Sequence, residues 1–206
     1  MIIAYKLMKV DADGRLHFPF CDTGKVVGLG CWMRAEDKSV EKDGRRFAPL
    51  VFRGGTRGEA VPRPGFHLGE IPYAPHIGIG GTQRQREHIG DEDVWVECEV
   101  VDEVDWQREA DRNGMNKKGK VVRSRADIRD RVPVNGFYRY RTNPSMPSDW
   151  IIAGDMRMLR VMYDDEVIAI AESRGLKPMP RLHGLKPREW TDGINRLNGG
   201  VARDGN

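Results

Sequence analysis

The amino-acid sequence lacks any apolar run of roughly 18 residues, the shortest stretch that spans a membrane as a helix. It also lacks a basic N-terminal region followed by a long apolar stretch, so we expect no secretory signal peptide. A large excess of one charge is missing too, because 34 Lys and Arg stand against 31 Asp and Glu, a formal net charge of +3. A balance this even does not by itself indicate a nucleic-acid-binding protein. We therefore expect a protein without membrane contact.

Cysteine is scarce, and the cysteines are not spaced as pairs. The three cysteines, Cys21, Cys31 and Cys98, form no Cys-x-x-Cys motif and leave an odd number. This favours reduced thiols in a cytoplasmic protein. The histidines at positions 67 and 76 are nine residues apart, which is not the spacing of two zinc ligands on one helix. We expect no metal site.

Glycine and proline are abundant, with 24 and 12 residues, and indicate many turns. Five Trp, six Phe and five Tyr argue against wholesale disorder. The chain length favours one domain with an appended segment. We assign residues 1–174 to a single domain. Residues 175–206, which contain the motif GLKP twice and are rich in Pro, Gly and basic residues, are predicted to form a tail.

Most predicted elements are short strands. Apolar and polar residues alternate in VWVECEVV, which predicts a strand with Val94, Val96 and Cys98 on one face. The other predicted strands are 2–10, 16–20, 26–36, 49–53, the start of 66–81, 136–143, and two segments within 150–163 that meet near Gly154. Helices are predicted within 102–114, ending at Gly114, and over 164–175, whereas 37–46 is read as a charged loop. The class is therefore α+β, with split mixed or antiparallel sheets and a few short helices.

The densest group of polar side chains lies in RPGFHLGEIPYAPHIG, residues 63–78, which three prolines stiffen. His67 and His76 with Arg63 satisfy the minimum for a small ribonuclease, namely an acid, a base and a cation for the phosphate. His67 is the stronger candidate, because strand alternation places it opposite the apolar Phe66 and Leu68.

Three segments together resemble ADP-ribosyltransferases. GFHLGE (65–70), VWVECEVVDEVDW (94–106) and SDWIIAGDMRMLRVM (148–162) are similar, in this order, to motifs of that family, and the likeness covers about residues 2–165. The resemblance implies an ADP-ribosyltransferase-like fold, NAD as cofactor, and transfer of ADP-ribose to a host protein or nucleic acid. It implies His67 and Asp149 as catalytic residues that face each other across one notch, with Asp149 stabilising the oxocarbenium-like transition state. It also implies that Lys6 and Arg63 meet the pyrophosphate and that Tyr73 or Trp150 packs on nicotinamide.

Residues 1–170 also resemble an uncharacterised domain encoded by phages and prophages, in the RPG-aromatic-His, VWxExE and YRYRTNP segments. This resemblance implies a location in the cytoplasm of the host bacterium. The first strand carries Lys6 where the transferase family has Arg or His, position 67 is His in place of Tyr or Ser, and position 149 is Asp in place of Glu. A second hypothesis is therefore a non-catalytic protein of the same fold that binds and inhibits a host defence complex.

The segment 115–131 is basic and is predicted to be a mobile loop with a short helix. Seven Lys and Arg stand there against two Asp, so it is a candidate contact for an acidic partner, either protein or nucleic acid. In YRYR (138–141) the tyrosines alternate with arginines, which also suits a sheet edge or a nucleic-acid contact.

Overall fold

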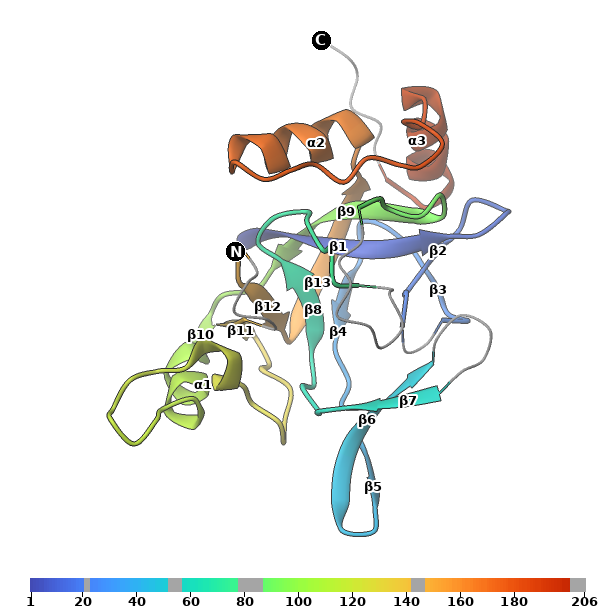
Figure 1. Cartoon of the computed structure of the whole chain (residues 1–206). Helices are drawn as coiled ribbons and strands as arrows, with labels where there is room; N and C mark the ends of the chain where they lie inside the picture. Colours follow the sequence, from blue (N-terminus) through green and yellow to red (C-terminus); the bar gives the residue numbers. More distant parts are fainter. Residues whose placement is uncertain (21–22, 52–56, 78–86, 142–146, 201–206) are drawn as a thin grey trace. The chain divides into compact units, whose positions relative to one another are not determined.

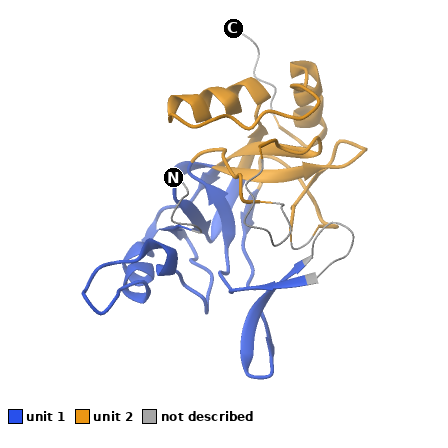
Figure 2. Ribbon diagram, viewed as in Figure 1, with its two compact units in different colours: residues 1–4, 32–70, 99–157 blue, residues 5–31, 71–98, 158–206 orange. Residues whose placement is uncertain are grey.

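The computed structural model describes residues 1–20, 23–51, 57–77, 87–141 and 147–200 (Figure 1). These residues contain thirteen strands, three α-helices and one short 3-10 helix, which confirms the α+β class. The chain divides into two compact units, coloured separately in Figure 2. Unit 1 comprises Met1–Ala4, Trp32–Glu70 and Glu99–Arg157, and unit 2 comprises Tyr5–Cys31, Ile71–Cys98 and Met158–Asn206. Three strands contribute residues to both units: β1 (Ile2–Val10), β9 (Asp93–Val100) and β13 (Asp155–Val161).

Four strands of unit 1 include those that carry the candidate site residues His67 and Trp150, and Asp149 directly precedes one of them. They are ordered β10 (Val104–Asp105), β11 (Gly136–Tyr140), β12 (Trp150–Ala153) and β8 (Phe66–Gly69). The pair β10–β11 is parallel and the other pairs are antiparallel, so the sheet is mixed, as expected. Along β11 buried residues alternate with half-buried ones, as the YRYR pattern predicts for a strand.

Two glycines let the backbone come close at the ends of these strands. A Cβ atom on Gly136 would lie 2.1 Å from the carbonyl oxygen of Val104, and one on Gly154 would lie 2.2 Å from that of Pro133. Gly154 also separates β12 from β13, as predicted. No residue other than glycine fits these positions without moving the backbone.

The helix α1 (Gln107–Asn113) ends at Gly114, where the sequence predicts its end. The side chain of its first residue, Gln107, forms hydrogen bonds with the backbone of β11. The Gln107 amide accepts from the Arg139 N–H at 2.8 Å and donates to the Arg139 carbonyl at 3.2 Å. The side chain thereby occupies a backbone position that the short strand β10 does not reach, and this fixes the helix beside the strand.

The predicted charged loop 37–46 is instead part of a hairpin. The strands β5 (Val40–Lys42) and β6 (Arg45–Val51) pair in antiparallel fashion, and β7 (Arg57–Ala60) pairs with β6. The connecting residues Asp43 and Gly44 have φ angles of 53° and 69°. Two consecutive left-handed residues in an Asp-Gly turn are typical of a tight hairpin, so turn chemistry prevails over the high charge. Elsewhere in unit 1, β4 (Trp32–Arg34) pairs with the first residues of β13.

In unit 2, the residues of β1 from Lys9 onward pair with β2 (Leu16–His17), which pairs with β3 (Val26–Val27). Two helices follow β13: α2 (Asp164–Ser173), as predicted, and α3 (Arg188–Leu197), which the sequence analysis did not predict. Two asparagine side chains, one within α3 and one at its C-terminal end, form hydrogen bonds with backbone groups elsewhere in unit 2. Asn195 exchanges hydrogen bonds of 2.7 and 3.1 Å with the N–H and carbonyl of Val161. Asn198 donates to the Gly14 carbonyl at 2.8 Å and accepts from the Leu16 N–H at 3.2 Å.

The segment between α2 and α3 is held by a buried ion pair. The Arg181 guanidinium donates to both carboxylate oxygens of Asp164, from Nε at 2.7 Å and from Nη2 at 3.0 Å. Its Nη1 donates to the Gly90 carbonyl at 2.8 Å, and the Lys186 N–H donates to Asp164 at 2.9 Å. The described part of the predicted tail, residues 175–200, thus contains both a helix and a buried arginine, and residues 201–206 lie outside the described residues.

Candidate functional site

A buried carboxylate in unit 1 organises several of the predicted site residues. Asp127 is 3% exposed, and its two carboxylate oxygens accept from the Nε of Arg63 at 2.9 Å and from the Nε of Arg129 at 3.0 Å. Two arginines on one carboxylate neutralise its charge and satisfy both oxygens. Arg63, predicted to meet a pyrophosphate, therefore has an intramolecular anionic partner.

His67 belongs to the same packed group. Its Nε2 lies 3.0 Å from the carbonyl oxygen of Arg63, and its Nδ1 lies 3.4 Å from the hydroxyl of Tyr140. The guanidinium of Arg63 lies 5.0 Å from the centroid of the Tyr140 ring, within cation–π distance. Both imidazole nitrogens thus have protein partners. A histidine held in this way serves first to fix the positions of the groups that surround it.

Asp149, the predicted catalytic carboxylate, is also paired. It accepts from the Nε of Arg141 at 2.8 Å and lies 3.6 Å from the Nε of Arg123, which in turn donates to Asp111 at 2.8 Å. Its side chain is 15% exposed. An anion that is to stabilise an oxocarbenium ion must face the sugar. Asp149 instead faces two cations of its own chain.

The strand register places His67 and Asp149 on opposite faces of the sheet. Residue 67 is paired with Ile152 and residue 69 with Trp150, so Asp149 comes next, opposite Glu70. Successive side chains on a strand point to opposite faces, and directly paired residues share a face. His67 therefore shares its face with Ile152 and Trp150, whereas Asp149 points to the other side. The expected arrangement across one notch is not what the register shows.

Of the remaining predicted site residues, Trp150 lies on the same sheet face as His67, and the others belong to unit 2. Trp150 is 4% exposed in the core of unit 1. Lys6 and Tyr73 belong to unit 2, where the Lys6 ammonium lies 5.3 Å from the centroid of the Phe18 ring. His76, the second histidine of the ribonuclease hypothesis, is in unit 2 as well, and burial lowers its pKa. Within unit 1 the structure thus brings together Arg63, His67 and Trp150, whereas Asp149 points to the other face of the sheet.

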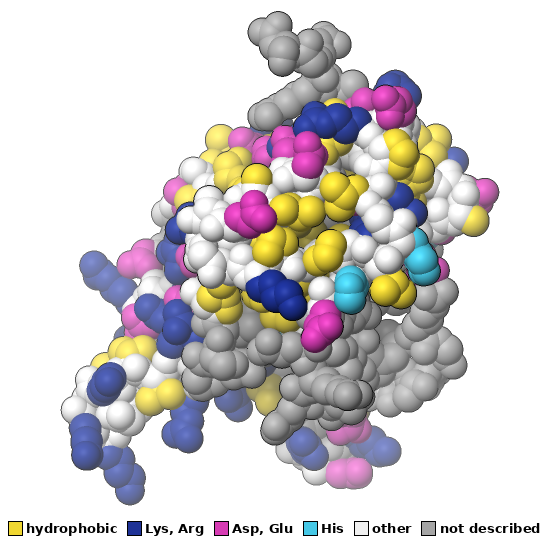
Figure 3. All heavy atoms as spheres, turned by 45° about the horizontal axis from the view of Figure 1, so that its top comes forward, with side chains coloured by type: hydrophobic (Ala, Val, Ile, Leu, Met, Phe, Trp, Pro, Cys, Tyr) yellow, Lys and Arg dark blue, Asp and Glu magenta, His cyan; other side chains and the backbone are white. Residues whose placement is uncertain are grey.

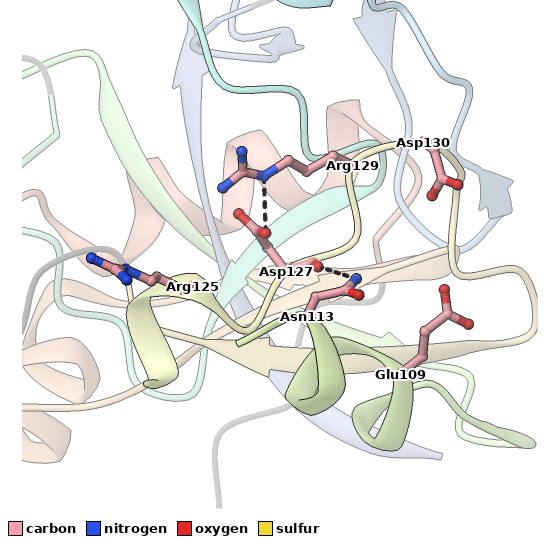
Figure 4. A pocket seen from close by; sticks show the side chains of 6 residues that line it. All are labelled: Glu109, Asn113, Arg125, Asp127, Arg129 and Asp130. Carbon is pink, nitrogen blue, oxygen red and sulfur yellow. Dashed lines mark hydrogen bonds and ion pairs between the residues drawn. The ribbon is translucent and has the colours of Figure 1, made fainter. Parts of the chain in front are cut away.

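A pocket of about 550 Å³ lies beside α1 in unit 1 (Figure 4). Its lining residues are Glu109, Asn113, Arg125, Asp127, Arg129 and Asp130. In the view of Figure 4 the guanidinium groups lie to one side of Asp127 and the carboxylates of Glu109 and Asp130 to the other. Sequence reasoning missed this pocket, because Glu109 and Asn113 come from α1 and the others from a segment more than ten residues further along.

The same region of unit 1 carries the basic turn, which we define as residues 115–121. Met115 and Val121 form an antiparallel bridge, and the Asn116 side chain accepts from the backbone N–H of Lys118 at 2.9 Å and of Lys120 at 3.0 Å. The side chains of Lys117, Lys118 and Lys120 are exposed. Figure 3 shows Lys and Arg side chains gathered over this part of the unit, at the lower left of the view. The predicted mobile loop is therefore an ordered turn, followed by the 3-10 helix Arg123–Arg125.

Comparison with known proteins adds no assignment, because no protein-family model, curated protein or solved structure matches the chain. No helix in the described part of the chain is long and apolar enough to cross a membrane. Within the described residues, no group of three His, Cys, Asp or Glu is placed to hold a metal ion. Cys31 and Cys98 are free thiols and Cys21 lies outside the described residues. Burial raises the pKa of Cys98 to about 12, so this thiol stays protonated and is no nucleophile at neutral pH.

Proposed function

We propose that the chain is a non-catalytic binding protein that holds a nucleic-acid backbone on the basic turn of unit 1. One observation carries the proposal. Residues 112–125 contain six Lys or Arg and no Asp or Glu. The three lysines of the turn are exposed and form no ion pair with any described residue. Their charge is therefore available to an external polyanion.

The turn presents these lysines in a fixed arrangement. The Asn116 side chain holds two backbone N–H groups, and Gly119 adopts a φ of 72°, which tightens the turn. The Val122 N–H donates to the Gly114 carbonyl at 2.9 Å and closes the base of the turn. An ordered turn loses less conformational entropy on binding than a mobile loop, so more of the electrostatic attraction contributes to affinity.

The residue types favour nucleic acid over an acidic protein. Protein interfaces are depleted of lysine and have an apolar or aromatic centre. Around the turn, the exposed large apolar side chain is Met115, at 51% exposure. Lysine is a strongly hydrated point charge on a flexible stem, and it suits contacts with phosphates that shift along a backbone. A partner recognised mainly through its phosphates fits this surface best.

The geometry supports binding over ADP-ribosyl transfer. Transfer needs a carboxylate within hydrogen-bond reach of the nicotinamide ribose. Asp149 lies on the face opposite His67 and is engaged by Arg141 and Arg123. A nucleic-acid backbone, by contrast, needs only exposed cations, and the basic turn supplies them.

The test is fluorescence anisotropy with a short labelled DNA duplex and the corresponding RNA at increasing NaCl concentration. The variant K117E/K118E/K120E removes the three contacts. We expect its affinity to fall at least about tenfold and the slope of log K against log salt to decrease by about 2.7, since each phosphate contact contributes roughly 0.9. The control K25E/K42E/K177E changes three exposed lysines outside the turn by the same total charge.

Equal losses in the two triple variants would show that only net charge matters and would reject the basic turn as the binding site. An acidic peptide that binds as well as the duplex and with the same dependence on the turn would replace nucleic acid as the partner. Transfer is tested in parallel with labelled NAD and host lysate. Labelling that D149A abolishes and K117E/K118E/K120E retains would favour the transferase instead.

A further inference from the structure

We infer that the pocket beside α1 binds the terminal phosphate of a nucleotide chain. The inference rests on the proposed function, because it assigns a second contact to the same nucleic acid. Asn113 and Arg125, which flank the basic turn in the sequence, both line the pocket. A strand lying along the lysines would therefore bring its end to the pocket.

The charged side chains that line the pocket differ in whether they are paired with other groups of the protein. Both oxygens of Asp127 are taken by Arg63 and Arg129, and Glu109 and Asp130 both contact Arg131. These carboxylates are accordingly compensated by neighbouring arginines, and their charge does not repel an incoming anion strongly.

Two guanidinium groups retain free donors. Arg125 has no hydrogen bond or ion pair from its side chain to any described residue, and Arg129 uses only its Nε, on Asp127. The terminal nitrogens of Arg129 and the whole guanidinium of Arg125 thus remain available. Planar guanidinium forks match the oxygen geometry of a phosphate, and they bind a terminal phosphate with its higher charge better than an internal diester.

The size of the pocket sets the class of ligand. A volume of about 550 Å³ is within the range of small-molecule sites and exceeds what inorganic phosphate alone would fill. An internal nucleotide is tethered on both sides, which restricts how its phosphate can approach a pocket that α1 lines on one side. A terminal nucleotide is tethered on one side, and its phosphate can reach the arginines.

The experiment compares three labelled single strands of one sequence, which carry a 5′-phosphate, a 3′-phosphate or hydroxyls at both ends. The variants are R125Q and, as a matched control, R108Q, whose guanidinium is also exposed on unit 1 but does not line the pocket. We expect the wild type and R108Q to bind one of the two phosphorylated strands about tenfold more tightly than the strand with hydroxyls at both ends. Charge-assisted hydrogen bonds of about 1.5 kcal/mol or more imply a difference of this size. R125Q is expected to lose this preference.

Equal affinity of the wild type for all three strands, or a preference that R125Q retains, would overturn the inference. Tighter binding of a polyamine such as spermidine, lost in E109Q, would assign the pocket to a cation and also overturn it. The proposed function has a separate readout, because K117E/K118E/K120E tests the basic turn with the unphosphorylated strand. A phosphate preference that persists when the turn variant binds this strand normally would uphold the pocket and reject the turn.

Discussion

Removing the guanidinium of Arg181 tests the ion pair that holds the segment between α2 and α3. The Arg181 side chain is 1% exposed and that of Asp164 is 9% exposed. In R181A the carboxylate keeps the Lys186 N–H but loses its two hydrogen bonds from the guanidinium. The Gly90 carbonyl loses the Arg181 donor and keeps the Asp93 N–H.

Breaking a buried ion pair by truncating one partner costs about 3–5 kcal/mol, because an uncompensated charge stays buried. Asp164 is the first residue of α2, where the positive end of the helix dipole stabilises an anion. We therefore expect the lower end, about 3 kcal/mol of unfolding free energy. For a chain of this length that corresponds to a decrease in melting temperature of roughly 6–12 °C.

The assay is urea unfolding followed by circular dichroism, together with a thermal melt. The double variant R181M/D164L separates charge from packing, since replacing both partners by apolar residues of similar volume is often neutral. It should recover most of the stability lost in R181A. A loss in R181A below about 1 kcal/mol, or an equal loss in the double variant, would show that the cost does not come from an unpaired buried carboxylate.

Two further predictions concern backbone approach and pH. G136A should lower the free energy of unfolding in urea by about 3 kcal/mol, because its Cβ would lie 2.1 Å from the Val104 carbonyl oxygen. The control G24A, with open space around the new Cβ, should be nearly neutral. Similar values for both variants would contradict the close approach at Gly136. Burial lowers the pKa of His76 from its usual value near 6.5, so the unfolded chain binds this proton at higher pH than the folded chain. The unfolding free energy should therefore fall as the pH decreases from 6.5 through the folded pKa, and H76Q should lessen this fall; an unchanged pH profile in H76Q would refute the assignment.

The strands and helices that follow simple periodicity could be predicted from the sequence. The alternation in β9 and β11, the break at Gly154 and the end of α1 at Gly114 are all confirmed. These features depend on neighbours within a few residues, so local pattern and backbone freedom are enough to predict them.

The hairpin β5–β6 and the helix α3 were missed for different reasons. The hairpin has a local signal, Asp43-Gly44, but the high charge of the residues around it favours a loop. The helix α3 contains Gly193, follows a Pro-rich stretch and is held by asparagine side chains on distant backbone. Its stability comes from tertiary contacts, which helix propensity does not reveal.

The partners of the candidate site residues could not be predicted either. Arg63 and Asp127 are 64 positions apart in the sequence, and nothing local indicates that they pair. The basic composition of 115–131 was evident, yet whether its lysines were free or paired became visible only in the fold. Charge can be counted in a sequence, but its neutralisation depends on long-range geometry.

The asparagine side chains that hold α3 have a consequence for chemical ageing. Asn198 is followed by Gly199, and an asparagine before glycine is the most readily deamidated kind, a slow change that warmth and high pH accelerate. Deamidation would turn the amide that donates to the carbonyls of Gly14 and Ile194 into a carboxylate, which cannot donate and which those oxygens repel. Stored protein should accumulate molecules in which the C-terminal end of α3 has lost its hydrogen bond to the Gly14 carbonyl. Peptide mapping of aged samples would locate the modified residue, and N198Q would extend the shelf life if this site governs it.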